Sequence, residues 1–194
     1  MCNADLKRCS WAGDDPLYQR YHDQEWGLPC RDDRTLFEFL VLEGAQAGLA
    51  WITILRKREN YRAAFDHFDA QKVAGYSQDK IDALLADPGI VRNRLKVASA
   101  VSNAQLFLDI QAKKGSFAKF IWQFVEDTPV QNSWQEMAQV PVTTEVSDAM
   151  SKELKRLGFK FVGSTICYAY MQATGMVNDH LTSCFRHAEV NKVK

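Results

Sequence analysis

Residues 32–65 read DDRTLFEFLVLEGAQAGLAWITILRKRENYRAAF, and this stretch has a clear helical periodicity. Asp32 and Asp33 are of a residue type that favours the start of a helix. The positions that follow at spacings of three and four, and would share one helical face, are Leu36, Leu40, Glu43 and Ala47. The spacing predicts a helix that ends near Gly48 and a second helix from about Trp51 to Phe65.

Helical spacing continues outside this stretch, and residues 78–110 are expected to form a helical hairpin. Ser77 starts a short helix, Asp87-Pro88-Gly89-Ile90 breaks it, and a long helix with apolar residues at helical spacing follows. Further helices are predicted for 116–125, for 148–157 before Gly158, and for 165–174 before Gly175.

Strand-like composition is confined to residues 141–146 and 159–162, too little for a sheet of independent stability. Residues 126–147 are interpreted as a long loop. We therefore predict an all-α helical bundle with a helix-hairpin-helix element. With 194 residues, 46% of them hydrophobic, the chain can bury one core, and residues 1–194 are expected to form a single domain.

Composition also restricts the functional classes. No apolar run approaches the ~20 residues of a membrane-spanning helix, and the amino-terminal residues lack the pattern of a secretory signal, so we expect a cytoplasmic protein without a membrane partner. The formal net charge is zero, so the chain lacks the overall basic character typical of nucleic-acid binding. A DNA-binding protein can, however, confine its positive charge to one patch.

Two cysteines and two histidines near the chain ends are candidate metal ligands. His180 and Cys184 are four residues apart, so on a helix they would project from one face, and Cys9 and His22 can supply the other two positions. A tetrahedral site closed by four protein ligands is typical of structural zinc, which would join the two ends of the chain. The alternative is that His180 and Cys184 only cap and pack a final helix.

Glu43 is a carboxylate on an otherwise apolar helical face. Burying it without a partner costs several kcal/mol, so it is expected either to make a salt bridge or cap an N–H group, or to line a cavity that receives a cation. Aromatic residues flank its helix in sequence; they are Trp11, Tyr18, Tyr21, Trp26 and Trp51. Aromatic rings beside a carboxylate can bind a flat cationic base through cation–π attraction, whereas the alternative for each ring is core packing.

The hairpin carries a candidate site for a DNA backbone. Pro88 and Gly89 allow a sharp turn whose backbone N–H groups are expected to face outward, and Arg92, Arg94 and Lys96 follow. The alternative is an ordinary helical turn with a solvated basic face.

Taken together, these residues resemble the bacterial type I 3-methyladenine DNA glycosylases of the helix-hairpin-helix superfamily. The resemblance covers nearly the whole chain and rests on RCSWAGDDPLYQRYHDQEWG at 8–27, LFEFLVLEGAQAGLAWITILRKRENYRAAF at 36–65, GIVRNRLKV at 89–97 and GFKFVGSTICYAYMQATGMVNDH at 158–180.

The resemblance implies a monofunctional, monomeric repair enzyme that removes 3-methyladenine from double-stranded alkylated DNA. It implies that Glu43 and Tyr21 contact the edge of the extruded base, that Trp51 stacks on it, and that Trp11, Tyr18 and Trp26 line the surroundings. It further implies one structural zinc ion held by Cys9, His22, His180 and Cys184, and a hairpin around Gly89 that holds DNA. The aspartate that the wider superfamily places beyond the hairpin has no counterpart here, because Asp109 is expected inside the long helix.

Two other functions are compatible with parts of the sequence. A non-catalytic, zinc-dependent binder of damaged DNA would use the same pocket without turnover. A structural helical interaction protein accounts for the composition, but not for a carboxylate among aromatic residues on an apolar face.

Overall fold

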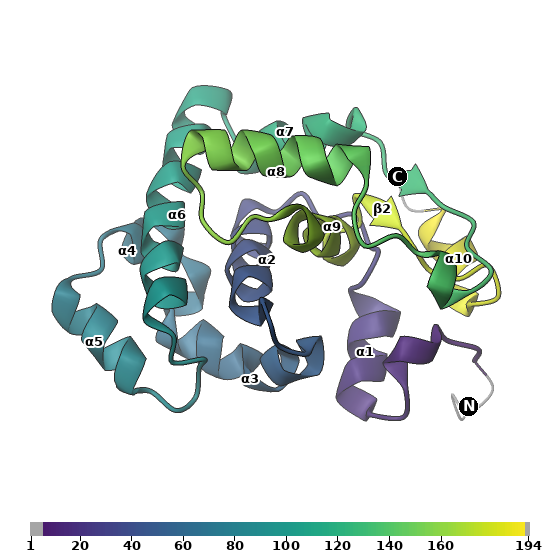
Figure 1. The fold of residues 1–194 in the computed structure, drawn as a ribbon, viewed down its shortest axis with the longest axis horizontal. Coiled ribbons are helices and arrows are strands. Elements are labelled where there is room, and N and C mark those ends of the chain that lie inside the picture. The colour runs from purple at the N-terminus through teal and green to yellow at the C-terminus, as the bar shows by residue number, and fades with distance from the viewer. Residues whose placement is uncertain (1–5, 193–194) are drawn as a thin grey trace.

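The structure, a computed structural model, describes residues 6–192 and is mostly helical (Figure 1). Its α-helices are α1 (Pro16–Gln24), α2 (Asp33–Gln46), α3 (Trp51–Ala64), α4 (Ala70–Ala74), α5 (Gln78–Ala86), α6 (Arg94–Lys114), α7 (Phe117–Trp122), α8 (Glu145–Leu157), α9 (Ser164–Ala173) and α10 (Phe185–Val190). The 3-10 turns are η2 (Ser10–Ala12), η3 (Asp66–Phe68), η4 (Gln123–Val125) and η5 (Met137–Gln139). The predicted all-α class is confirmed by this helical content.

Helix α2 lies in the centre of the fold. The Asp32 carboxylate accepts a hydrogen bond from the Thr35 N–H and so starts the helix as predicted. Residues 36–45 are all buried, because α3, α6 and α9 pack around them. Figure 1 shows α6 and α9 on either side of α2, with α3 below it. Glu43 is thus enclosed on a helix that is covered on all sides, rather than on one apolar face.

The helical hairpin has the predicted bounds to within a few residues. The Ser77 hydroxyl accepts from the Lys80 N–H at the start of α5, and the Asn93 side chain accepts from Leu95 and Lys96 N–H at the start of α6. Residues 87–93 form the connecting turn. This pair of helices stands at one edge of the molecule (Figure 1).

The strand-like segments at 141–146 and 159–162 do not form strands. The two described strands are β1 (Val130–Gln131) and β2 (Val177–Asn178), which pair in parallel. Residues 141–146 lead into α8, which begins at Glu145, three residues before the predicted start, because Thr144 and Ser147 form a reciprocal capping box. The predicted loop at 126–147 therefore contains β1 and η5.

The spacing of His180 and Cys184 would place both on one face of a helix, but the two residues do not lie on one helix. His180 follows β2 in an irregular segment, and Cys184 is the N-cap of α10. The Phe185 N–H donates to the Lys7 carbonyl at 3.0 Å, so the carboxyl-terminal helix lies beside the amino-terminal segment. Within the described part of the chain, no helix is long and apolar enough to cross a membrane.

Gly175 ends α9 with a φ of +68°, and a Cβ atom there would lie 2.2 Å from the backbone carbon of Leu28. Gly175→Ala is therefore expected to lower the free energy of unfolding by about 3 kcal/mol or more, since backbone must move to make room. Gly115→Ala is the control, because Gly115 also has a positive φ, in the left-handed helical region, but a Cβ atom there would meet only the Lys119 Nζ at 3.6 Å; a cost of about 1 kcal/mol is expected. Denaturant unfolding of both variants measures the difference, and equal costs would contradict the steric explanation.

Candidate functional site

A cavity of about 190 Å³ opens beside the carboxyl-terminal half of α2. Its lining residues are Trp11, Tyr18, Tyr21, Trp26, Glu43, Gln46, Trp51, Met137, Ala169 and Gln172. The structure thus brings together Glu43 and all five aromatic residues that the sequence singled out. These residues come from separate segments, so the cavity exists only in the folded chain.

Helix α1 presents two of the aromatic rings to the cavity. Pro16 occupies its first position, and the Asp15 carboxylate accepts from the Leu17 and Tyr18 N–H groups. Tyr18 and Tyr21 are three residues apart and therefore lie on one face of this helix.

The aromatic side chains form a continuous wall. The ring of Trp11 lies 4.9 Å from that of Trp26 and 5.0 Å from that of Tyr18, and the Tyr21 and Trp51 rings are 5.4 Å apart. Tyr21 and Trp26 are buried in the core, as the packing alternative predicts, yet both also line the cavity. These two rings therefore pack in the core and also line the cavity.

Glu43 is 4% exposed, and among the described residues its carboxylate makes no hydrogen bond or ion pair. Glu38, also buried on α2, is instead paired with Arg58 and Arg62. Glu43 therefore neither forms a salt bridge nor caps an N–H group among the described residues. Burial raises the Glu43 pKa to about 8, so the group is mostly neutral at pH 7 until a positive charge enters the cavity.

Cys9, His22, His180 and Cys184 form a buried cluster whose possible ligand atoms all lie within 4.8 Å of one another. His22 directs Nε2 toward the cluster, while its Nδ1 lies 2.8 Å from the Asp23 carboxylate. His180 directs Nδ1 toward both sulfur atoms, and its Nε2 donates to the Trp26 carbonyl at 3.0 Å. Two sulfur and two nitrogen donors in this arrangement could hold one metal ion.

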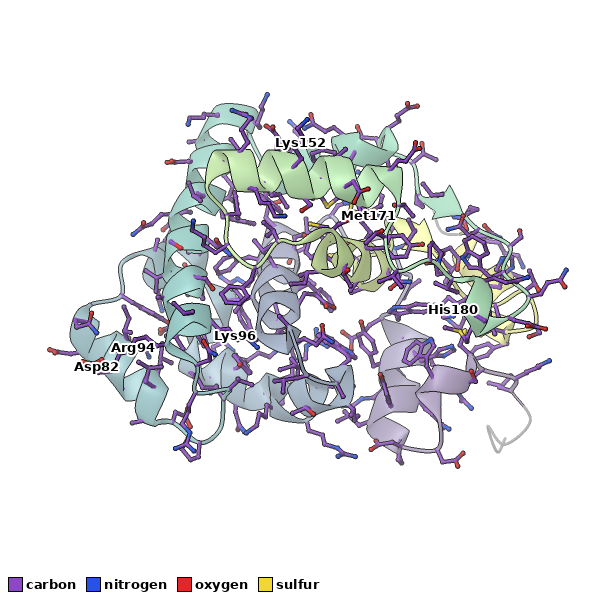
Figure 2. The ribbon with its side chains drawn as sticks, in the orientation of Figure 1. Asp82, Arg94, Lys96, Lys152, Met171 and His180 are labelled. Carbon is purple, nitrogen blue, oxygen red and sulfur yellow. The ribbon has the colours of Figure 1, made fainter. Side chains whose placement is uncertain are left out.

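The cluster lies directly behind the aromatic wall of the cavity. The His180 ring is 4.6 Å from the Trp26 ring and nearly perpendicular to it, and the His22 ring is 5.2 Å from the Trp11 ring. Figure 2 shows His180 near the junction of the amino-terminal segment and the carboxyl-terminal elements. The residues that join the chain ends therefore also support the cavity.

The hairpin residues divide into two groups. Arg92 and Arg94 are exposed and make no ion pair with any described residue. Lys96 instead donates to the Ala45 and Ala47 carbonyls at 2.8 and 2.7 Å, so its ammonium group caps the end of α2. In Figure 2 Lys96 lies close to α2, whereas Arg94 lies on the side of α5.

The expectation of outward-facing N–H groups at the hairpin turn is wrong for four of them: the Ile90 and Asn93 N–H groups donate to the Asp87 and Val91 carbonyls, and those of Gly89 and Val91 donate to side chains. The Gly89 N–H donates to the Asp87 carboxylate at 2.7 Å, and the Val91 N–H donates to the Tyr61 hydroxyl at 3.1 Å. The turn uses these donors to hold its own shape.

Four residues that line the cavity were not expected from the sequence. Gln46 lies one turn after Glu43 on α2, so helical spacing could have found it. Met137, Ala169 and Gln172 come from segments far away in sequence, and no local pattern marks them. Met137 belongs to the predicted loop, where it begins the turn η5.

A family model described as methyladenine glycosylase matches residues 11–187. The chain belongs to this family. It is 48% identical over 179 residues to DNA-3-methyladenine glycosylase 1 of Escherichia coli (strain K12), with 92% of this chain and 96% of that protein covered. It is also 48% identical over 177 residues to DNA-3-methyladenine glycosylase of Haemophilus influenzae, with 91% of this chain and 96% of that protein covered. Membership of the methyladenine glycosylase family makes the chain a glycosylase, an enzyme of the hydrolase class.

Solved structures of the methyladenine glycosylase family share the fold. A crystal structure of a 3-methyladenine DNA glycosylase I matches with a TM-score of 0.90 and 50% identity, covering 92% of this chain and 98% of that one. A structure of the 3-methyladenine DNA glycosylase I of Staphylococcus aureus, which concerns recognition of 3-methyladenine, also matches. The TM-score is 0.89 and the identity 37%, with 93% of this chain and 96% of that chain covered.

Glu43→Gln is expected to stabilise the protein in a pH-dependent way. Because the folded-state pKa is raised to about 8 from 4.5, the folded protein holds one more proton than the unfolded chain between these values, and wild-type stability falls as pH rises through them. The variant should match the wild type at pH 4 and exceed it by on the order of 3 kcal/mol at pH 7. Urea unfolding at both pH values measures this, with the exposed Glu59→Gln as control. A pH-independent difference would contradict the assigned pKa.

Proposed function

We propose that this glycosylase hydrolyses the N-glycosidic bond of 3-methyladenine in alkylated double-stranded DNA, as the first step of base excision repair. The observation that carries the proposal is the Glu43 carboxylate, which has no partner in the described part of the chain and lies in a cavity walled by aromatic rings. The names of its relatives, DNA-3-methyladenine glycosylases at 48% identity, support the choice of substrate.

The cavity suits one extruded base. Its volume of about 190 Å³ lies below the roughly 300–1,000 Å³ of pockets that take drug-sized ligands. We assign Trp51 to stack on the base, Glu43 and Tyr21 to contact its edge, and Trp11, Tyr18 and Trp26 to line the surroundings. Stacking contributes about 1–3 kcal/mol per base, and the positive charge of a methylated adenine adds cation–π attraction.

Charge selects the substrate in this proposal. A cationic base that enters the cavity favours the ionised form of Glu43, which then gives up its proton and pairs with the base. A neutral base gains neither this ion pair nor the cation–π attraction. The cavity therefore favours alkylated adenine over the undamaged base.

Bond cleavage needs little acid catalysis, because a methylated adenine is already a good leaving group. Glu43 can orient water or stabilise the positive charge that develops on the sugar. No lysine is among the described residues that line the cavity, which supports a monofunctional enzyme without Schiff-base chemistry. Asp109 lies inside α6, away from the cavity, and is given no catalytic role.

The α5–α6 pair is proposed as a helix-hairpin-helix element that holds the DNA backbone. Arg92 and Arg94 are exposed and free to meet phosphates, and Gly89 shapes the turn between the helices. Lys96 is included in the same surface, although in the structure its ammonium group caps α2. One chain, acting as a monomeric single domain over residues 1–194, suffices for this arrangement.

The metal proposed for the Cys9, His22, His180 and Cys184 cluster is one zinc ion. Two thiolates and two imidazoles fit its preference for tetrahedral nitrogen and sulfur ligands, and four protein ligands give zinc a structural role. Arg8 holds Asp23 through a bidentate contact, and Asp23 in turn orients His22. These contacts join the chain ends behind the cavity wall.

Zinc binding is expected at one ion per chain. Cys184→Ser should lose the ion and lower Tm by roughly 10 °C or more, because a structural zinc contributes several kcal/mol to folding. Elemental analysis and thermal unfolding measure these effects. Cys167→Ser is the matched control, since Cys167 is also buried but lies outside the cluster. Full zinc content in the Cys184 variant would overturn the assignment.

Incubation with methylated DNA is expected to release free 3-methyladenine but not 7-methylguanine, as measured by chromatography. Glu43→Gln should lower the rate on the order of 10²-fold, because it removes the charge that pairs with the base. The exposed Glu59→Gln is the control. Intact, zinc-loaded protein that binds damaged DNA without release would favour the non-catalytic binder, and a borohydride-trapped adduct would contradict the monofunctional mechanism.

A further inference from the structure

Asp179 is a buried carboxylate that the proposed mechanism does not use, and it is hydrogen-bonded to Gln172, which lines the cavity. Asp179 is 1% exposed, and among the described residues it has no cationic partner. Its Oδ1 accepts from Asn132 Nδ2 and Trp134 Nε1, both at 2.7 Å. Its Oδ2 accepts from the Tyr168 hydroxyl at 2.6 Å and from Gln172 Nε2 at 2.8 Å. Four neutral donors therefore converge on one group that, when ionised, can only accept.

This arrangement fixes the orientation of the Gln172 side chain. An amide can normally turn over to present either its NH₂ group or its oxygen, but a carboxylate partner requires the NH₂ group. The Gln172 carbonyl oxygen is left free, since it makes no hydrogen bond within residues 6–192. Gln172 lines the cavity together with Ala169, one turn earlier on α9. The free polar end of Gln172 is thus an acceptor.

We propose that Gln172 is a specificity-determining residue, which accepts a hydrogen bond from the exocyclic amino group of the extruded base. Asp179 is the positioning residue that holds it in this orientation. The inference rests on the proposed function and deepens it. A 6-aminopurine offers a donor to the Gln172 oxygen, whereas a 6-oxopurine would set two acceptors against each other and leave both without a hydrogen bond.

The hydrogen bonds around Asp179 predict what happens when it becomes an amide. Trp134 Nε1 can only donate, so Asp179→Asn must keep an oxygen at the Oδ1 position and place its NH₂ group at the Oδ2 position. The Tyr168 hydroxyl can then accept instead of donate. Gln172 must turn over to accept as well, which presents its NH₂ group as the free end. The variant should therefore favour a 6-oxo base.

The test compares binding of free 3-methyladenine with its 6-oxo counterpart, 3-methylhypoxanthine. Binding is followed by quenching of tryptophan fluorescence, because Trp11, Trp26 and Trp51 line the cavity. The ratio of the two dissociation constants should favour 3-methyladenine in the wild type. Asp179→Asn should shift that ratio about 10-fold or more toward 3-methylhypoxanthine, and Gln172→Leu should shift it by less and without a reversal.

Gln105→Leu is the matched control, since Gln105 also donates to one acceptor, the Ala74 carbonyl, but lies away from the cavity. Zinc content is measured for Asp179→Asn because the neighbouring His180 belongs to the metal cluster. If this variant has lost the ion, the ratio of dissociation constants measured for Gln172→Leu decides the test. An unchanged ratio in the intact variants overturns the inference alone. Wild-type protein that neither binds these bases nor releases 3-methyladenine overturns the proposed function, and the inference with it.

Discussion

The rest of the site depends on the burial of the Glu43 carboxylate without a partner. The helices packed around α2 and a wall of aromatic rings shield this group from water, and no described side chain compensates for the loss of hydration. Burial of this kind costs folding free energy and raises the pKa to about 8. In the proposed function, the same burial makes the cavity favourable for a flat cation, because ionisation of Glu43 and binding of the cation would support each other. A local cost in stability would thereby be converted into selectivity.

Keeping this cavity in shape requires contacts between the ends of the chain. The rings of Trp11 and Trp26 form one wall, and the buried histidines His22 and His180 pack directly against them. On the other side, the Asp179 carboxylate joins the β1 segment to α9. Both supports use residues close to His180, so the carboxyl-terminal segment braces two walls of the cavity.

Much of the fold follows from local sequence. The ends of α2 and α3 agree with the predictions because Asp32 and the apolar spacing act within one or two helical turns. The errors lie where distant segments decide the conformation. The strands form where residues 130–131 and 177–178 meet, rather than where β-branched residues are frequent. His180 and Cys184 approach each other through a turn, whereas their spacing suggested a helix.

The sequence by itself determined the helical class, the five aromatic residues, Glu43 and the four candidate metal ligands, because residue type and short-range spacing encode helix formation and ligand chemistry. Only the tertiary structure decided that Glu43 has no partner among residues 6–192, that Lys96 caps α2, and that Gln172 and Met137 reach the cavity. These facts depend on contacts between segments separated by tens of residues or more. A one-dimensional pattern does not record such contacts, since they arise only when the helices pack.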